Sequence, residues 1–354
     1  MQIAFRWYGA NNDSVTLRQI KQIPGTASIV WALHHKKPGE LWTLDEIEKE
    51  VTEIKKHGFH FNIVESVNIH EDIKLGLPSR DEYIANYKQT IRNLAASGVD
   101  TICYNFMPVF DWIRTDLNKE LADGSTAMFY EAAKINNITP QELVSKITEI
   151  PDFTMPGWEP DRLKNIQHLI EQYHKVSKDT LWDNLQYFLN SILPVCEEHG
   201  VRMAVHPDDP PWPLFGLPRI MNSYEDLERL LQLSDSSANG ITLCTGSLGA
   251  KEENNLSDMI YAFKDRIYFA HVRNVRRYEN GDFIETSHRT RDGSVNIAGI
   301  MRAFHDIGYD GYIRPDHGRQ IWDEQCRPGY GLYDRALGIM YLLGIWDTLQ
   351  KGEL

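Results

Sequence analysis

The chain has 354 residues and a mass of 40.9 kDa, and 37 lysines and arginines against 50 aspartates and glutamates give a formal net charge of −13. A hydrophobic content of 42% with 25% charged residues is typical of a soluble globular protein and excludes a disordered or collagen-like chain. The excess negative charge repels phosphate backbones and anionic lipids, so we expect neither nucleic acid nor membranes as partners.

Three further features of the sequence indicate where the protein works. The longest stretches without a charged residue, such as 338–346, fall well short of the ~20 apolar residues that a membrane helix needs. The opening MQIAFRWYG lacks the charged-then-apolar layout of a signal peptide. We therefore expect a cytoplasmic protein whose four cysteines, at positions 103, 196, 244 and 326, are free thiols.

One pattern repeats along the chain: an amphipathic helical stretch, a glycine, and a short apolar run rich in β-branched or aromatic residues. In 43–56 the apolar residues fall at helical spacing, and Thr43 and Glu46 predict a capping box at the start. Ser79 and Glu82 predict a second capping box ahead of the next helix. The same pattern recurs in 181–199, 224–233 and 297–307.

Eight apolar runs are predicted to be strands. They lie near residues 2–8, 28–34, 60–66, 101–106, 201–206, 241–245, 267–272 and 311–316. Strands that alternate with helices pair in parallel through crossover connections, and eight such units close into a barrel. The sequence therefore predicts a single (β/α)8 TIM barrel over residues 1–354.

A typical barrel takes about 250 residues, so about 100 must be insertions. Most of them lie in 107–179. This segment contains the stretch DFTMPGWEP and a predicted helix whose cap is formed by Thr139 and Glu142. Because this segment follows the fourth strand, it rises from the face where barrel active sites lie, and we predict a partial lid. A second insertion, 273–294, follows the seventh strand and contains Asn280-Gly281, which predicts a hairpin.

Four successive strands each end in a candidate metal ligand: His206 in AVHP, Cys244 in TLCTG, His271 in FAHVRN and Asp316 in IRPDHG. A lone strand histidine or cysteine is more often a core residue. Neighbouring strands of a closed barrel surround one mouth, however, so side chains at equivalent heights converge. A thiolate, two imidazoles and a carboxylate suit Mn²⁺, Fe²⁺, Co²⁺ or Zn²⁺ better than Mg²⁺ or Ca²⁺.

Most other histidines are expected to be solvated or to cap helices, as His57, His199 and His305 do in the last turns of their helices. A few end a strand or lie in the seventh-strand loop and remain candidates for the barrel mouth. They are His34, His35, His288 and His317.

Several long segments resemble the D-mannonate dehydratase family of the hexuronate degradation pathway. They are AVHPDDPPWPLFGLPRI, LCTGSLG, FAHVRN, RPDHGR and PGYGLYDRALG, with FRWYG at the start. This resemblance covers essentially the whole chain and implies a xylose-isomerase-like barrel, a Mn²⁺ or Fe²⁺ ion, and dehydration of D-mannonate to 2-keto-3-deoxy-D-gluconate.

By position, the family's metal ligands fall on the four strand-end residues, and its acid/base residues fall on His317 and a tyrosine of PGYGLYDR. For the tyrosine we favour Tyr330 over Tyr333, because it follows a Pro-Gly turn. The reaction takes a proton from C2 and expels hydroxide from C3, which suits a metal ion with one general base and one general acid. Which of the two residues is the base stays open.

Inward-facing positions supply the predicted substrate contacts. Tyr8 lies on the inward face of the first strand, and Glu65 and Asn105 belong to the third and fourth strands. Arg6, Arg202 and Arg314 also lie on inward faces, where charged residues need partners. For Arg202 and Arg314, a structural ion pair in the barrel floor is at least as good an explanation as a substrate contact. Five arginines in the seventh-strand insertion suit a sugar carboxylate, and we choose Arg289 among them.

Two alternatives remain open at this stage. The first is a metal-dependent aldose–ketose isomerase on the same barrel, although Cys244 as a ligand counts against it. The second is a non-catalytic sugar-acid binding protein, which predicts a damaged set of site residues. No nucleotide fingerprint accompanies Gly329-Tyr330-Gly331. We expect a homodimer that binds a small sugar acid.

Overall fold

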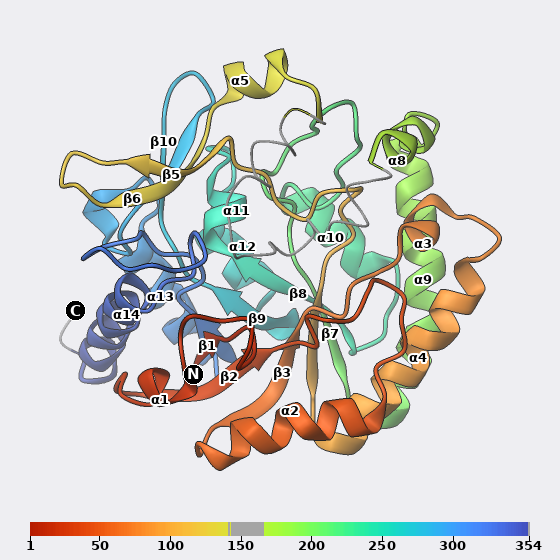
Figure 1. The fold of residues 1–354 in the computed structure, drawn as a ribbon, viewed down its shortest axis with the longest axis horizontal. Coiled ribbons are helices and arrows are strands. Elements are labelled where there is room, and N and C mark those ends of the chain that lie inside the picture. The colour runs from red at the N-terminus through yellow and green to blue at the C-terminus, as the bar shows by residue number, and fades with distance from the viewer. Residues whose placement is uncertain (141, 143–165, 353–354) are drawn as a thin grey trace.

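Eight parallel strands close into a barrel in the computed structural model, which describes residues 1–140, 142 and 166–352 (Figure 1). The strands are β1 (Gln2–Arg6), β2 (Thr26–Trp31), β3 (His60–Glu65), β4 (Thr101–Tyr104), β7 (Arg202–Val205), β8 (Asn239–Cys244), β9 (Ile267–His271) and β12 (Tyr312–Arg314). Their order around the barrel is β1-β12-β9-β8-β7-β4-β3-β2. The prediction of a (β/α)8 barrel is confirmed, and each predicted run overlaps one of these strands, although β2 and β8 begin two residues earlier than predicted.

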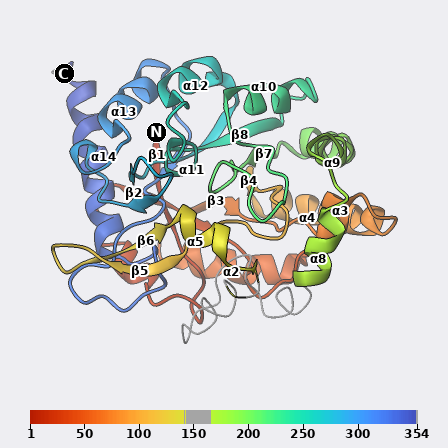
Figure 2. The same ribbon diagram turned by 90° about the horizontal axis from the view of Figure 1, so that it is seen from above.

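Helices surround the strands, as Figure 2 shows for the larger ones. They are α1 (Leu17–Ile20), α2 (Leu44–Lys56), α3 (Glu71–Leu75), α4 (Arg80–Ser97), α5 (Ala132–Asn137), α8 (Ile166–Tyr173), α9 (Lys178–His199), α10 (Tyr224–Gln232), α11 (Thr245–Gly249), α12 (Leu256–Ala262), α13 (Ile297–Asp306) and α14 (Tyr333–Gln350). Short 3₁₀ turns cover Lys264–Arg266 and Thr290–Asp292. No helix in the described ranges is long and apolar enough to cross a membrane.

The helix starts show which local predictions hold. Thr43 and Glu46 form the predicted capping box at the start of α2. The second predicted box is wrong, because Ser79 adopts helical dihedral angles and its hydroxyl donates to the Asp72 carboxylate instead. A serine hydroxyl bonds whichever acceptor lies nearest, and here the preceding short helix supplies one.

The predicted cap in the first insertion is present. The Thr139 backbone N–H donates to Glu142 Oε2 at 2.7 Å, and the Glu142 N–H donates back to Thr139 Oγ1 at 3.2 Å. The body of the helix that this cap would start and the stretch DFTMPGWEP lie outside the described residues. The lid role of 107–179 stays a prediction.

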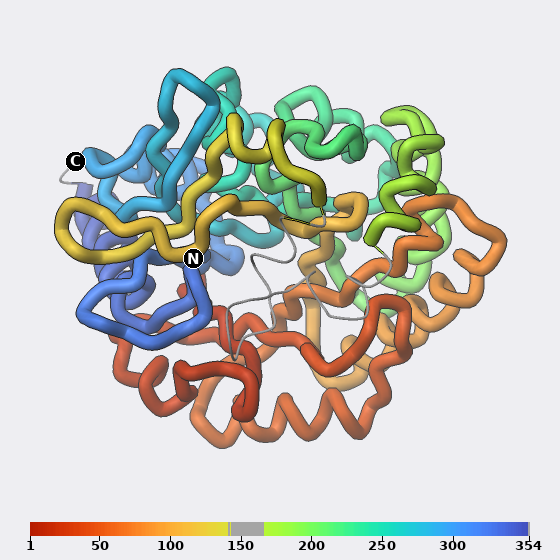
Figure 3. The backbone as a smooth tube through the Cα atoms, turned by 45° about the horizontal axis from the view of Figure 1, so that its top comes forward, coloured from red at the N-terminus to blue at the C-terminus, as the bar shows by residue number. Residues whose placement is uncertain are grey.

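The two insertions together form a second sheet, which the sequence did not predict. Its strands are β5 (Asp116–Glu120), β6 (Thr126–Tyr130), β10 (Val275–Arg277) and β11 (Phe283–Glu285), in the order β10-β11-β6-β5. The hairpin predicted at Asn280-Gly281 joins β10 to β11 and is confirmed. Pairing of Phe283 with Tyr130 joins the insertions, and the hairpin of β5 and β6 and that of β10 and β11 lie on the same side of the molecule in Figure 3. We call this the accessory sheet.

Small and aromatic side chains fill the inside of the barrel. They form a separate cluster from the apolar layer between strands and helices, and comprise Ala4, Val30, Ile63, Cys103, Ala204, Tyr268, Phe269 and Tyr312. This packing closes the barrel floor beneath the carboxyl ends of the strands. The parallel register there pairs His271 with Cys244 on one side and with Arg314 on the other.

Candidate active site at the carboxyl ends of the strands

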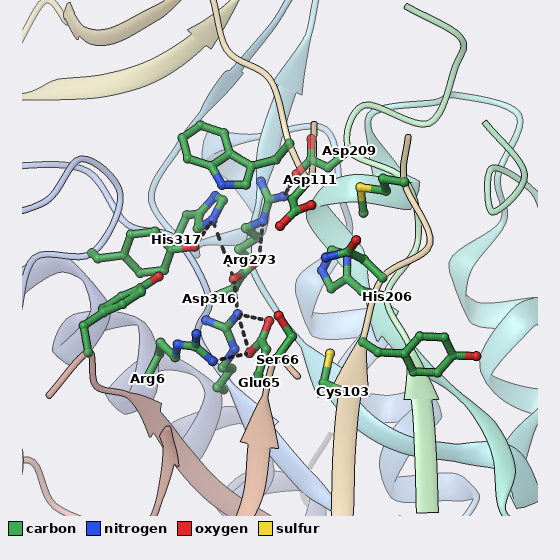
Figure 4. A pocket seen from close by; sticks show the side chains of 17 residues that line it. Arg6, Glu65, Ser66, Cys103, Asp111, His206, Asp209, Arg273, Asp316 and His317 are labelled. Carbon is green, nitrogen blue, oxygen red and sulfur yellow. Dashed lines mark hydrogen bonds and ion pairs between the residues drawn. The ribbon is translucent and has the colours of Figure 1, made fainter. Parts of the chain in front are cut away.

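A cavity lies over the carboxyl ends of the barrel strands, and Figure 4 shows the side chains that line it. Most of the predicted site residues line it: Tyr8, Glu65, Asn105, His206, Asp316, His317 and Tyr330. Cys244 and His271 lie directly behind this lining and are fully buried. The first insertion adds Asp111 and Trp112 to the wall.

The four predicted metal ligands converge at one side of this cavity. His206 Nε2 lies 3.1 Å from His271 Nδ1, and Asp316 Oδ2 lies 3.6 Å from Cys244 Sγ and 3.7 Å from His271 Nδ1. Donor atoms of His206, Cys244 and His271 all lie within 4.8 Å of one another. Asp316 reaches this point from a left-handed backbone conformation with φ 59°, which few residues other than glycine adopt.

Neighbouring groups hold these four side chains in place. His206 Nδ1 lies 2.7 Å from the Pro207 carbonyl, which leaves Nε2 facing the cluster. His271 Nε2 lies 3.5 Å from Glu65 Oε2, on the side of the ring away from the cluster. Cys244 Sγ accepts from the Ser247 hydroxyl at 3.1 Å and from its backbone N–H at 3.4 Å. Partners of this kind orient metal-binding side chains in proteins.

The charges favour an ionised sulfur. Burial disfavours the thiolate, but the Arg273 guanidinium and the neighbouring His206 hold the pKa of Cys244 well below its usual range. Burial likewise disfavours the charged imidazole, yet Cys244, Glu65 and Asp316 raise the pKa of His206 to about 9. The negative charges of Cys244, Glu65 and Asp316 thus favour a positive charge at this point, which the protonated His206 supplies here and a metal ion could supply instead. A thiolate, two imidazoles and a carboxylate fit a borderline-soft divalent ion.

Arg273 is the centre of a buried ion-pair network beside this cluster. Its Nε donates to Asp316 Oδ2 at 2.6 Å, its Nη2 donates to Asp209 Oδ2 at 2.7 Å, and its Nη1 pairs with Glu285. Arg114 binds two of these three carboxylates, Asp209 at 2.6 Å and Glu285 at 2.7 Å. The network therefore links one predicted ligand to both insertions.

His317 lies on the opposite side of the cavity from His206 (Figure 4), and it forms a pair with Tyr330. The Tyr330 hydroxyl lies 2.9 Å from His317 Nε2, and the ring of Tyr8 packs edge-on against Tyr330. Burial and the adjacent Tyr8 raise the pKa of Tyr330 well above its usual value. Tyr333 lies on the surface, where 40% of it is exposed and its ring contacts Trp322.

Other sequence candidates lie away from the cavity. Arg289 is half-exposed, its nearest carboxylate is Asp292 at 3.9 Å, and it does not line the cavity. Arg273 is the arginine of that insertion that does. His35 is exposed beside Glu46, and Arg202 pairs with Asp100 away from the cavity mouth.

Two further histidines lie behind the lining. His34 contacts the ring of Tyr8, and His288 Nε2 lies 2.7 Å from the Pro315 carbonyl. Neither of them lines the cavity.

The sequence did not single out Arg114, Asp209 or Glu285. Asp209 lies three residues after His206 in the segment AVHPDDPPW, at the end of the fifth barrel strand. This short separation in sequence could have predicted that Asp209 lies near the site. Arg114 and Glu285 belong to the insertions, and no local pattern brings residues so distant in sequence together.

Comparison with known proteins agrees with this arrangement. The family model of D-mannonate dehydratase (UxuA) matches residues 1–354. The chain is 64% identical over 351 residues to mannonate dehydratase 1 of Bacillus licheniformis, covering 99% of this chain and 96% of that protein. It is 57% identical over 350 residues to mannonate dehydratase of Bacillus subtilis, covering 99% and 98%.

Solved structures give the same picture. The mannonate dehydratase of Streptococcus suis superposes with a TM-score of 0.90 at 42% identity, covering 99% of this chain and 95% of that one. A D-psicose 3-epimerase from Clostridium cellulolyticum, at 12% identity and a TM-score of 0.54 over 100% and 98%, shares the fold alone. From its full-length match and its close relatives, this chain belongs to the D-mannonate dehydratase family, a family of hydro-lyases.

Proposed function

We propose that this protein dehydrates D-mannonate to 2-keto-3-deoxy-D-gluconate in hexuronate catabolism. The observation that carries the proposal is one cavity that holds both the convergent cluster of His206, Cys244, His271 and Asp316 and the hydrogen-bonded pair of His317 and Tyr330. Family membership supplies the substrate class. The intact set of side chains argues against a binding protein that has lost catalysis.

Guanidinium N–H groups that lack a hydrogen-bond partner in the described residues support an acidic substrate over a neutral sugar. Arg6 and Arg314 line the cavity and are buried, and each has an Nε and an Nη1 with no hydrogen-bond partner among the described residues. Both arginines also flank Glu65, and Arg314 pairs with Asp316 Oδ1 at 2.8 Å through its Nη2, so the unpartnered N–H groups are the Nε and Nη1 of each. A buried N–H without an acceptor is costly, and a carboxylate of the substrate satisfies it. A neutral aldose offers no such group.

We further propose that His206, Cys244, His271 and Asp316 hold Mn²⁺ or Fe²⁺, because their donor atoms converge and the Cys244 thiol is held ionised. When bound, such an ion would act as a Lewis acid that makes the proton on C2 of the substrate more acidic.

The pair of His317 and Tyr330 would move the protons. The reaction breaks the C2–H bond and the C3–O bond, so one group accepts a proton and another protonates the departing hydroxide. The raised pKa of Tyr330 supports the donor role for its phenol, and His317 Nε2 is then the acceptor. The 2.9 Å hydrogen bond between them provides a route by which His317 returns its proton to Tyr330 after water has left. The enol product then becomes the ketone without a redox cofactor.

The test is to incubate the purified protein with D-mannonate and, separately, with neutral aldoses, and to measure 2-keto-3-deoxy product. We expect this product from D-mannonate alone, loss of turnover with EDTA, and recovery with Mn²⁺ or Fe²⁺. Formation of a ketose from an aldose would favour the isomerase alternative instead. If His317→Ala and Tyr330→Phe both kept wild-type turnover, the assignment of the proton-transfer residues would be wrong.

A further inference from the structure

One carboxylate outside the barrel contacts the proposed proton acceptor. Glu285 is the last residue of β11 in the accessory sheet and is 1% exposed. Its Oε1 lies 3.3 Å from His317 Nδ1, the ring nitrogen that faces away from Tyr330. Glu285, His317 and Tyr330 therefore form a continuous chain of polar contacts that ends in the cavity.

Both insertions fix the position of this carboxylate. Arg114, which precedes β5, donates to Glu285 Oε1 at 2.7 Å, and Arg273, which precedes β10, pairs with the same oxygen. Asp209 in turn binds both guanidinium groups, Arg114 at 2.6 Å and Arg273 at 2.7 Å. Two arginines and one backbone ladder thus hold Glu285, and its side chain has little freedom to turn away from His317.

We propose that Glu285 is a positioning residue for His317, an inference that rests on the proposed function. By accepting a hydrogen bond from Nδ1–H, Glu285 fixes the tautomer in which Nε2 carries the lone pair. That lone pair then faces the Tyr330 hydroxyl and the cavity. The accessory sheet is accordingly part of the catalytic machinery, because it supplies the group that orients a barrel residue.

A purely structural role for Glu285 makes a different prediction. If the carboxylate only neutralises Arg114 and Arg273, its removal lowers the amount or stability of folded protein, and it does so whether or not His317 is present. If Glu285 acts through His317, its removal has no further effect on turnover once His317 is gone, since residues that act as a unit are strongly non-additive.

The experiment is a double-mutant cycle with the metal-loaded, full-length protein. Glu285→Met keeps most of the volume but removes the acceptor, and Glu285→Gln keeps an acceptor oxygen but removes the charge. Each is made alone and in the His317→Ala background. The control is Asp334→Asn, which also removes a buried carboxylate, paired with Arg319 at 2.9 Å, but forms no hydrogen bond or ion pair with His317 in the described part of the chain and does not line the cavity.

In the wild-type background we expect Glu285→Met to lower kcat on the order of 10- to 100-fold, the usual loss when a carboxylate that orients a histidine is removed, with KM within about 2-fold. Glu285→Gln loses less. In the His317→Ala background, Glu285→Met and Glu285→Gln each lower kcat by less than about 2-fold. Asp334→Asn changes kcat by the same factor in both backgrounds. An equal loss from Glu285→Met in both backgrounds, or wild-type kcat, overturns the proposal.

Two outcomes need a separate measurement. If Glu285→Met does not fold, Glu285→Gln is used in its place, and its loss of kcat is compared between the wild-type and His317→Ala backgrounds. If the wild-type protein does not turn over D-mannonate, the proposed function fails, and the contact is then tested by urea unfolding of the Glu285→Gln and His317→Ala cycle. Non-additive midpoints support the pairing of Glu285 with His317, and additive midpoints overturn it.

Discussion

Replacing Arg273 with methionine removes a buried positive charge while keeping most of the side-chain volume. The Arg273 guanidinium is 1% exposed and lies 2.6 Å from Asp316 and 2.7 Å from Asp209, and it also pairs with Glu285. Removing one partner of a buried ion pair costs about 3–5 kcal/mol, because the remaining charge stays out of water. Arg114 still neutralises two of the carboxylates, so we take the range for a single broken pair.

This loss translates into a measurable melting temperature. At about 2.1 cal/mol/K per residue, the unfolding entropy of 354 residues is about 0.7 kcal/mol/K, so we expect Tm to fall by about 4–7 °C. Circular dichroism melts in EDTA are the assay, because a bound cation would replace part of the missing positive charge. The control Arg291→Ala, a side chain 77% exposed, should shift stability by less than about 0.5 kcal/mol. An Arg273→Met protein that melts with the wild type would refute the reasoning.

Three further outcomes are expected. Tyr330→Phe should lower kcat by about 10²- to 10⁴-fold, whereas Tyr333→Phe, the exposed counterpart, should not; steady-state kinetics on D-mannonate compare them. Mn²⁺ at about 100 times its Kd should stabilise the EDTA-treated protein by about 2.7 kcal/mol, a rise in Tm of about 4 °C, and an unchanged melt would contradict the metal site. Gly246→Ala should reduce stability and turnover, because its Cβ would lie 2.3 Å from a buried guanidinium carbon; Gly344→Ala, with nothing within 4 Å, should be neutral or stabilising by up to about 1 kcal/mol in melts.

The barrel and the convergence of the four candidate ligands were predictable because both follow from regular geometry. Alternating helices and strands require parallel pairing, and parallel strands in a closed barrel end at one mouth. Once His206, Cys244, His271 and Asp316 were placed at strand ends, their convergence needed no further information. The structure places Tyr330 in the cavity wall and Tyr333 on the surface, so the preference for Tyr330 as the catalytic tyrosine stays a prediction, for which only Tyr330 is in position.

The rest depended on contacts between segments far apart in the sequence. The pairing of β6 with β11 carries no local signal, so neither the accessory sheet nor the contact of Glu285 with His317 was predictable. The composition of 273–294 showed that this segment is rich in arginine, but it did not show which of its arginines faces the cavity. Arg273 directly follows a barrel strand and points inward, whereas Arg289 lies beyond the hairpin and remains half-exposed.

The strand pairing between Phe283 and Tyr130 has a consequence for how the protein acquires activity. These partners are separated by more than 150 residues, and closing so long a loop is slow because its entropy is lost before the contacts form. During synthesis the first insertion leaves the ribosome well before its partner hairpin exists. The nascent chain therefore completes the network around His317 only after most of the barrel has been made. With the role proposed for His317, catalytic competence is then among the last properties that the folding chain gains.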